Sequence, residues 1–351
     1  EIRPRDWSSD VCSSDLGEFA PGLNTEPTIT RKEFGDLRAA FRDAHAVIEL
    51  ELKIGRHSGV PMETRGAIAR HDAVRDVLEL HGATKRPHPN RDMIARLLGR
   101  SPSSVHCYEC HIGGGFGVRG ELYPEDILVC VAALKLGRPV KWIEDRREHL
   151  VATTHAREVE CTLEIACNRD GTLIALRGHA RYDIGAYARP NAVTAPRNLA
   201  QMIMGPYRVP HVHMDVDVII TNKTPAGSYR GPGRFEADFC RERLFDIAAR
   251  ELGLDRIEFR RRNLLGTEEI PCTLPTVLPY KSSGAFDSGD YRATFTRCLD
   301  EFNWKNKATL QGQLIDGRYH GLGIGCYVEG GATGPRERAR VVLEADGMLS
   351  L

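Results

Sequence analysis

The spacing of apolar residues predicts a helix near the start of the chain and further helices later. Apolar residues at positions 34, 37, 40 and 41 follow a helical period, and Thr30 with Glu33 three residues later matches a capping box, so we expect a helix over residues 29–44. Apolar periodicity together with end signals predicts further helices over residues 90–98, 124–136, 235–252 and 255–263. These end signals are Asn90, Gly99, Pro124, Gly137, Gly253 and Asp255.

The pattern changes to a period of two in the middle of the chain. Apolar and polar residues alternate from 159 to 167 and from 212 to 218, which is typical of half-buried strands. The turn sequence at 168–171 predicts a hairpin into a strand over 172–182. Further strands are expected over 47–54, 104–112 and 140–144, and residues 266–290, rich in Pro, Gly and Ser, predict a surface loop. Helices interspersed with mostly antiparallel strands predict an α+β, or mixed α/β, fold.

Both ends of the chain have an unusual sequence. The chain begins with Glu1, and residues 7–16 form a near-tandem Ser/Asp repeat that is similar to a translated sequencing adaptor, so we expect residues 1–17 to be a non-native or disordered leader. Residues 340–345 predict a strand, and Asp346-Gly347 predicts a tight turn with only four residues after it. We therefore expect the chain to be a segment of a longer protein.

Charge and cysteine usage exclude several classes of partner. The chain has 351 residues with 48 basic and 48 acidic side chains, so its formal net charge is zero. A balanced charge provides no field for nucleic acid, and no apolar run reaches the roughly 18 residues that span a membrane. The ten cysteines are scattered, which is typical of reduced thiols in a cytoplasmic protein. We expect a cytoplasmic protein with neither nucleic-acid binding nor membrane insertion.

Two loops of unusual composition form the candidate functional site. Residues 113–117 have the sequence GGGFG and are called the glycine loop below; residues 228–234 have the sequence SYRGPGR and are called the arginine turn. Backbone without Cβ atoms can approach a ligand closely and direct N–H groups toward it. Arg230 and Arg234 add positive charge on the second loop. The two loops together predict a large, polar, anionic ligand that is held from two sides.

Three other patterns have competing interpretations. Gly115, Gly117 and Gly120 match a dinucleotide-binding fingerprint and Glu144 lies near the spacing of a ribose-binding acid, so a Rossmann NAD-dependent dehydrogenase is an alternative, although the next helix begins only at Pro124. The sequence CYECH at 107–111 matches a haem-attachment pattern, which we interpret as a chance match, and no metal-ligand set is expected. The run of arginines at 260–262 is typical of a solvated helix end.

The chain from about residue 56 to residue 351 resembles the molybdenum-binding subunit of the xanthine dehydrogenase / aldehyde oxidase family, and most of all its bacterial carbon-monoxide-dehydrogenase-like large chains. Seven segments carry the resemblance in the family's order and spacing: HSGVPMETRGAIA (57–69), KRPHPNR (85–91), GGGFGVRGELYPEDI (113–127), GRPVKWIEDRREHL (137–150), TNKTPAGSYRGPGRFEADF (221–239), ELGLDRIEFRRRNL (251–264) and FDSGDY (286–291). The resemblance implies a first molybdenum-cofactor-binding domain over residues 56–351, truncated at its C-terminal end, preceded by the tail of a small α/β hammerhead-like domain over residues 18–55.

The resemblance also implies a cofactor and residues that bind it. The cofactor is molybdopterin, in bacteria often in its cytosine dinucleotide form. The family's glycine-loop role carries over to Gly114, Gly115, Phe116 and Gly117, and its transition-state arginine carries over to Arg230 as the catalytic residue. Further cofactor-binding candidates are Gly231, Lys85 and Arg262.

The implied reaction is the hydroxylation of an aldehyde or N-heterocycle-type carbon, with water as the oxygen source. The family passes the electrons through [2Fe–2S] centres to FAD on partner subunits, in a dimer of heterotrimers. A non-catalytic paralogue that keeps the fold as a scaffold is the alternative from another class.

Three positions depart from the family pattern. Lys85 stands where relatives often have a cofactor-binding Gln, which gives the scaffold alternative its support. Gly231 stands where true carbon monoxide oxidases have a Cys, so a copper-containing centre is not expected. Gly120 occupies the register of a purine-binding Glu, with Glu121 one residue later, so purine specificity is not supported.

The catalytic base of the family is a Glu near the C-terminus of a longer subunit, beyond Leu351. We therefore expect this segment alone to bind only part of the cofactor and to be inactive. Expressed by itself in a host that makes the cofactor, it should contain less than stoichiometric molybdenum by elemental analysis. A stoichiometric metal content would contradict this expectation.

Overall fold

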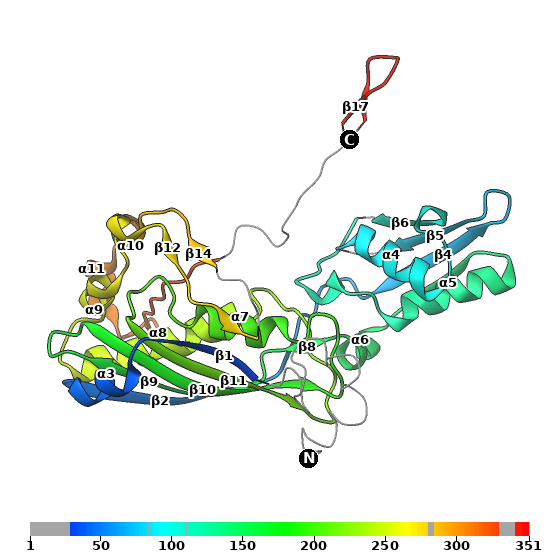
Figure 1. Ribbon diagram of the computed structural model, residues 1–351. Coiled ribbons are helices and arrows are strands. Elements are labelled where there is room, and N and C mark those ends of the chain that lie inside the picture. The colour runs from blue at the N-terminus through cyan, green and yellow to red at the C-terminus, as the bar shows by residue number, and fades with distance from the viewer. Residues whose placement is uncertain (1–28, 83–84, 110, 280–283, 330–340, 351) are drawn as a thin grey trace.

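The computed structural model describes residues 29–82, 85–109, 111–279, 284–329 and 341–350. Figure 1 shows two lobes, each built on one sheet with helices against it. The large lobe contains a six-stranded sheet and the small lobe a four-stranded sheet. The mixed α/β fold predicted from the sequence is confirmed. The expected leader at residues 1–17 and the second cysteine of CYECH, Cys110, lie outside the described residues.

The six-stranded sheet of the large lobe has the order β13-β1-β11-β10-β9-β2. Its strands are β1 (Ile29–Phe34), β2 (Ala46–Ile54), β9 (Val159–Cys167), β10 (Leu173–Gly185), β11 (His211–Ile220) and β13 (Val277–Leu278). Adjacent strands are antiparallel except for β10 and β11, which are parallel. A parallel pair needs a crossover connection, and here the crossover contains α7 (Thr194–Met202).

Helices cover both faces of this sheet. α7 packs against β1 and β11, and α8 (Arg234–Glu251) packs against β2 and β9. α3 (Leu37–Asp43) covers the opposite face, where Ala40 packs against Ala166 and Ala175. The remaining helices of the large lobe are α9 (Arg256–Asn263), α10 (Tyr291–Phe302) and α11 (Trp304–Lys307). The alternation predicted for 159–167 holds, since Val159, Leu163 and Ile165 are buried in the main core.

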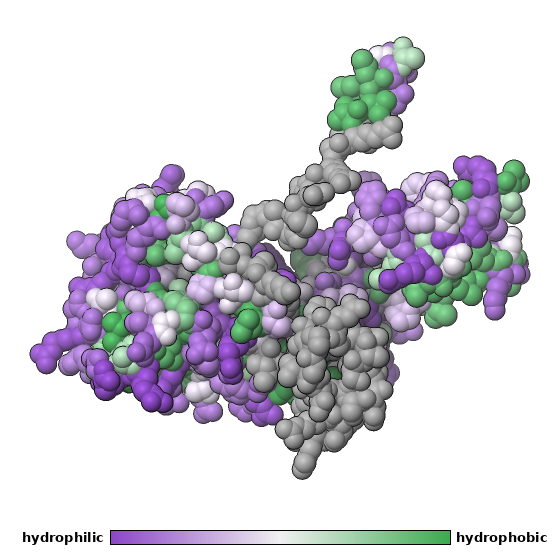
Figure 2. Space-filling model, viewed as in Figure 1, coloured by the Kyte–Doolittle hydropathy of each residue, from purple (hydrophilic) through white to green (hydrophobic). Residues whose placement is uncertain are grey.

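The small lobe has the strand order β6-β5-β4-β7. Its elements are β4 (Gly66–Asp72), β5 (Val77–Gly82), β6 (Val105–Glu109), β7 (Val140–Ile143), α4 (Pro87–Leu97) and α5 (Pro124–Leu136). α5 begins and ends at the predicted residues, and Gly137 stops it in the left-handed conformation with φ 62°. Figure 2 shows apolar surface on this lobe along α5, where Leu128 and Leu136 are exposed.

Short elements join and follow the two lobes. At the passage between the lobes, β3 (His57–Ser58) pairs with β8 (His155–Ala156), just after α6 (Arg146–Ala152). The others are β12 (Cys272–Thr273), β14 (Ala285–Phe286), β15 (Leu314–Ile315), β16 (Arg318–Tyr319), β17 (Val342–Leu343) and β18 (Leu349–Ser350), with 3-10 turns at Pro102–Ser104, Val118–Gly120, Thr267–Glu269 and Ala308–Leu310. β17 and β18 form the hairpin predicted around Asp346-Gly347, although position 340 lies outside the described residues. No helix among the described ranges is both long and apolar enough to cross a membrane.

Three sequence predictions about elements are wrong. The capping box at Thr30 and Glu33 does not form, because residues 29–34 are strand β1 and the helix starts later, with Asp36 accepting the N–H of Ala39 as N-cap. Pairing with β11 outweighs the local helical period here. α4 begins at Pro87 rather than after Asn90, because proline fits the first turn of a helix.

The third error concerns residues 266–290, which are not all loop. Val277 is buried, and its strand β13 extends the main sheet by pairing with β1. β12 and β14 form a small separate pair, while residues 280–283 lie outside the described part.

The expected domain boundary after residue 55 does not separate two sheets. β2 ends at Ile54 and pairs along its whole length with β9, and β1 pairs with β11. The strands before that position therefore share one sheet with residues 159–220.

Gly178 offers a test of packing in the large lobe. A Cβ at this position in β10 would lie 2.3 Å from Leu163 Cδ2 and 2.8 Å from the Thr162 carbonyl oxygen. Gly178→Ala should therefore lower the free energy of unfolding by about 2 kcal/mol, measured by urea denaturation. Gly55→Ala is the matched control, because a Cβ at Gly55 meets nothing within 4 Å. Equal midpoints for the two variants would contradict this packing.

Candidate functional site

The glycine loop and the arginine turn lie in direct backbone contact. The N–H of Arg230 donates to the carbonyl of Phe116 at 2.8 Å. Gly117 has φ 108°, and a Cβ there would lie only 2.4 Å from the carbonyl oxygen of Ser228. Only glycine fits this conformation and this approach. The two loops that the sequence singled out therefore form one site at the junction of the lobes.

Phe116 is held in an unusual conformation at the tip of the glycine loop. Its φ is 53°, in the left-handed region, and the residue is 45% exposed. The ring lies near Gly114, where a Cβ would come within 3.1 Å of both the Phe116 Cε2 and the Pro61 Cβ. An aromatic face is thus presented beside bare backbone.

The segment at residues 61–64 anchors the glycine loop. Glu63 and Gly113 exchange two hydrogen bonds: the Glu63 N–H donates to the Gly113 carbonyl at 3.1 Å, and the Gly113 N–H donates to the Glu63 carboxylate at 2.8 Å. Arg119 is buried and donates to the carbonyls of Glu63 at 2.6 Å and Thr64 at 2.8 Å. Arg146 donates in the same way to the carbonyls of residues 61 and 62.

The side chain of Arg230 is exposed and, among the residues that the structure describes, forms no ion pair. Arg234 on the same turn is different, because it pairs with the Glu329 carboxylate at 2.5 Å. The arginine turn therefore offers one uncompensated cation next to the glycine loop. No three His, Cys, Asp or Glu side chains gather as metal ligands within the described ranges.

Lys85 and Arg262, the other two predicted cofactor-binding cations, lie in different surroundings. The Lys85 N–H donates to the Arg119 carbonyl at 3.1 Å and its side chain is exposed, which places it next to the end of the glycine loop. Arg262 instead pairs with the Asp170 carboxylate at 3.1 Å, at the turn between β9 and β10. The structure therefore brings Lys85, but not Arg262, near the two loops.

The neighbouring Arg260 does not lie on a solvated face as predicted. Its side chain is fully buried, with Nε 2.7 Å from the Glu242 carboxylate and Nη1 2.8 Å from that of Asp246. Burial acts to lower the Arg260 pKa, but these carboxylates outweigh it and raise the pKa above its usual range.

The geometry is incompatible with the dinucleotide-binding alternative. α5 begins at Pro124, separated from the last glycine of the fingerprint, and β6 and β7 lie on opposite edges of the small sheet. The predicted ribose acid, Glu144, is buried between Arg65 at 2.5 Å and His149 Nδ1 at 2.8 Å. Burial acts to raise the Glu144 pKa, but the hydrogen bonds and charge of Arg65 outweigh it and hold the pKa below its usual value. This carboxylate has a structural role.

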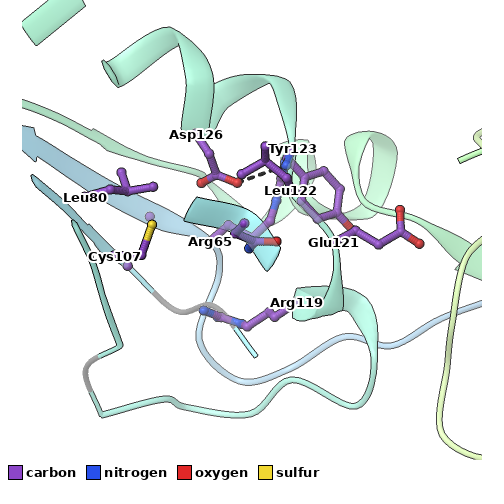
Figure 3. Close-up of a pocket in the computed structure, with 11 residues that line it drawn as sticks. Arg65, Leu80, Cys107, Arg119, Glu121, Leu122, Tyr123 and Asp126 are labelled. Atoms are coloured by element: carbon purple, nitrogen blue, oxygen red, sulfur yellow. Dashed lines mark hydrogen bonds between the residues drawn. The ribbon is translucent and has the colours of Figure 1, made fainter. Parts of the chain in front are cut away.

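A small cavity lies in the small lobe, lined in part by residues that follow the glycine loop, but it is not the candidate site. Figure 3 shows Arg65, Cys107, Arg119 and Asp126 around it. Its volume of about 20 Å³ has room for little more than one water molecule. Glu121, at its edge, points away from Cys107 in Figure 3, and its carboxylate binds Arg189 at 2.8 Å.

Sequence reasoning missed the residues that hold the two loops in place. Glu63 and Arg119 fix the glycine loop, and Arg157 donates hydrogen bonds to the carbonyl groups of the arginine turn. Glu63 and Arg119 lie within segments that carried the family resemblance, but their letters alone did not distinguish a buried anchor from a solvated charge.

The mixed α/β fold and the paired loops define a cofactor-binding domain, and comparison with known proteins identifies its family. Residues 21–264 match the model of the molybdopterin cofactor-binding domain. The chain therefore belongs to the molybdopterin-binding oxidoreductases related to xanthine dehydrogenase and aldehyde oxidase, as the sequence resemblance predicted.

Curated relatives agree with this assignment. The chain is 38% identical to the 6-hydroxypseudooxynicotine dehydrogenase complex subunit gamma of Paenarthrobacter nicotinovorans, over 95% of this chain and 42% of the relative. It is 36% identical to the nicotine 6-hydroxylase large subunit of the same organism, over 85% of this chain and 36% of the relative. It is 31% identical to the carbon monoxide dehydrogenase large chain of Hydrogenophaga pseudoflava, over 87% of this chain and 38% of the relative. The chain thus spans less than half the length of these relatives.

Solved structures show the same fold. Quinoline 2-oxidoreductase from Pseudomonas putida 86 matches with a TM-score of 0.73 and 34% identity, over 80% of this chain and 36% of that one. Carbon monoxide dehydrogenase from Oligotropha carboxidovorans matches with a TM-score of 0.71 and 30% identity, over 80% of this chain and 35% of that one.

The contact between the loops can be tested with two glycines of the same loop. Gly117→Ala should separate the loops, because the new methyl group would overlap the Ser228 carbonyl and the backbone has positive φ. Tryptic cleavage after Arg230 should then become about tenfold faster. Gly115→Ala is the control, since its methyl would meet only Arg119 side-chain atoms at 3.9 Å. Equal cleavage rates in the two variants would disprove the contact.

Proposed function

We propose that this chain belongs to the molybdenum-binding subunit of a hydroxylase that oxidises a carbon atom of an aromatic N-heterocycle. The observation that carries the proposal is the guanidinium of Arg230, which forms no ion pair within the described ranges and whose backbone N–H donates to Phe116 in a loop of bare backbone. A free cation beside exposed peptide groups suits an anionic, polar cofactor and a substrate that gains negative charge.

The residues of the two loops fit the molybdopterin cofactor. A Cβ at Gly115 would meet nothing closer than 3.9 Å, and one at Gly231 nothing closer than Glu329 Oε2 at 3.9 Å. Both positions therefore present backbone that is open on one side rather than filled by protein. Gly114, Phe116 and Gly117 are the other loop residues in this proposal, although the side on which Gly117 lacks a Cβ is taken up by the Ser228 carbonyl. Lys85 adds a positive charge near the end of the loop. Arg262 enters this proposal only as a residue of the family motif, because it is paired with Asp170.

In this proposal the cofactor supplies the redox chemistry, and the protein supplies binding and charge stabilisation. When bound, the cofactor supplies the oxygen transfer and accepts two electrons, and the net reaction is RH + H₂O → ROH + 2H⁺ + 2e⁻. Arg230 stabilises the negative charge that develops on the substrate heteroatom as its ring carbon is attacked. The glycine loop would hold the cofactor through its backbone groups, and the half-exposed Phe116 would offer it an apolar face.

The names of the relatives favour an N-heterocycle over an aldehyde. Nicotine 6-hydroxylase and quinoline 2-oxidoreductase are named for heterocyclic substrates. Purines are not favoured, because Glu121 is buried and bound to Arg189. A copper-containing centre is not favoured, because Gly231 has no thiolate.

The same proposal includes partners. One relative is named as the gamma subunit of a complex and another as a large subunit. We infer that this chain passes electrons to subunits with [2Fe–2S] clusters and FAD, as a dimer of heterotrimers in the cytoplasm. The cytosine dinucleotide form of the cofactor is part of the proposal.

The full-length gene product, purified with its partner subunits from a host that makes the cofactor, tests this function. Arg230→Ala should lower kcat about 100-fold to 1,000-fold, as loss of a fixed charge-stabilising group does, with molybdenum content unchanged. Arg297→Ala, which removes an exposed arginine that pairs with Glu301 on α10, is the control and should match wild type.

Gly115→Ala should instead reduce molybdenum content without lowering thermal stability, because its methyl group would meet no protein atom closer than 3.9 Å and would lie on the surface proposed for the cofactor. Full molybdenum content in Gly115→Ala, or wild-type kcat in Arg230→Ala, would reject the proposed site. Absence of molybdenum from the wild-type complex would favour the scaffold alternative.

A further inference from the structure

Arg157, which no sequence motif singled out, has an unusual backbone conformation and a buried side chain. Its φ is 78°, in the left-handed region that residues other than glycine seldom adopt. Its side chain is 6% exposed, and it follows β8 at the passage between the lobes. A buried arginine held in this way needs partners for its five N–H donors.

Those partners are the carbonyl groups of the arginine turn. Nη2 donates to the Tyr229 carbonyl at 3.0 Å and also to the Arg230 carbonyl, and Nη1 donates to the Gly231 carbonyl at 3.3 Å. Three consecutive carbonyls of the turn therefore point at one guanidinium. The planar, rigid fork of arginine allows this, and a lysine ammonium offers fewer donors from a single point.

A buried carboxylate and hydroxyl fix Arg157 from the other side. Glu236 is fully buried in the first turn of α8, and its carboxylate accepts from Arg157 Nη1 at 3.0 Å and from the Tyr182 hydroxyl at 3.1 Å. The same hydroxyl accepts the Arg157 N–H at 3.2 Å. The guanidinium also lies 4.8 Å from the Tyr229 ring centroid and 4.5 Å from that of Phe235. The group has little freedom to move.

The peptide group between Tyr229 and Arg230 links Arg157 to the glycine loop. In a trans peptide the C=O and N–H groups point in opposite directions. Here the Tyr229 carbonyl accepts from Arg157, and the Arg230 N–H on the other side donates to Phe116 at 2.8 Å. Each hydrogen bond polarises the next one along such a chain. Arg157 therefore orients the peptide that joins the two loops.

We propose that Arg157 is the positioning residue of the site. By binding three carbonyls of the arginine turn, it orients Arg230 toward the ligand. It also holds the Arg230 N–H in place to donate to the glycine loop at Phe116. The loop-positioning role depends on geometry alone, while its catalytic consequence rests on the proposed function. Arg157 does not itself contact the reacting atoms.

Hydrogen–deuterium exchange on this chain tests the positioning role without cofactor or activity. In Arg157→Lys, peptides covering residues 113–119 and 228–234 should both exchange about tenfold faster than in wild type. The matched control is Arg260→Lys, another buried arginine of the large lobe that binds a carboxylate of α8 and backbone carbonyls, but neither loop. It should leave both peptides unchanged. Equal exchange of these peptides in the two variants would overturn the proposal.

A second variant covers the case in which Arg157→Lys does not fold. Glu236→Gln keeps the shape of the partner but removes its charge, and it should speed exchange in the same two peptides to a smaller extent. If Glu236→Gln leaves both peptides as in wild type, Arg157 does not depend on this carboxylate and the proposal is wrong.

A double-mutant cycle in the full-length complex tests the catalytic consequence. Arg157→Lys should lower kcat about tenfold or more through Arg230, with KM and molybdenum content within threefold of wild type. In an Arg230→Ala background the same change should lower kcat less than twofold, because the group through which it acts is gone. Equal losses in both backgrounds would show that Arg157 acts only on stability. A complex without molybdenum would reject the proposed function while the exchange result still decides the positioning role.

Discussion

Loops without a β ladder must still satisfy their buried carbonyl groups, and in this protein guanidinium groups do so. Arg119 binds the carbonyls of residues 63 and 64, Arg146 those of residues 61 and 62, and Arg157 those of residues 229–231. An unsatisfied buried carbonyl costs about 1–3 kcal/mol, so each arginine secures several peptide groups at once. The rest of the site depends on this arrangement, because the glycine loop and the arginine turn meet only when both are held.

The same arrangement explains why the site lies between the lobes. Arg119 follows the glycine loop within the small lobe, between β6 and α5, whereas Arg146 opens α6 and Arg157 follows β8, where the chain passes from the small sheet to the large one. The loops can therefore keep an irregular, ligand-accessible backbone while the two sheets provide rigid support. Arg230 remains free of ion pairs within the described ranges, where the nearby carboxylates of Glu236 and Glu329 pair with Arg157 and Arg234 instead.

Much of the fold could be predicted from local pattern, and its errors have physical causes. α5 and α9 were placed correctly because proline, glycine and Asp255 mark their ends. The local sequence of β1 predicts a helix because its period is ambiguous, and only pairing with distant strands makes it a strand. The glycine loop was predictable because positive φ angles and close backbone contacts require glycine, which is visible in the sequence. Arg157 and Arg260 were not, because the sequence does not show whether an arginine is buried.

β1 pairs with β11 on one side and with β13 on the other, and β2 pairs with β9. During synthesis β1 and β2 leave the ribosome before their partners, since β9 and β11 are made only after the whole small lobe and β13 later still. The backbone groups along the edges of β1 and β2 therefore stay unpaired while the intervening chain is translated. Such edges are prone to pair with the wrong chain. Within the six-stranded sheet, β1 and β2 are therefore the strands whose edges stay unpaired longest during translation, and they depend on protection from wrong pairing until the sheet closes.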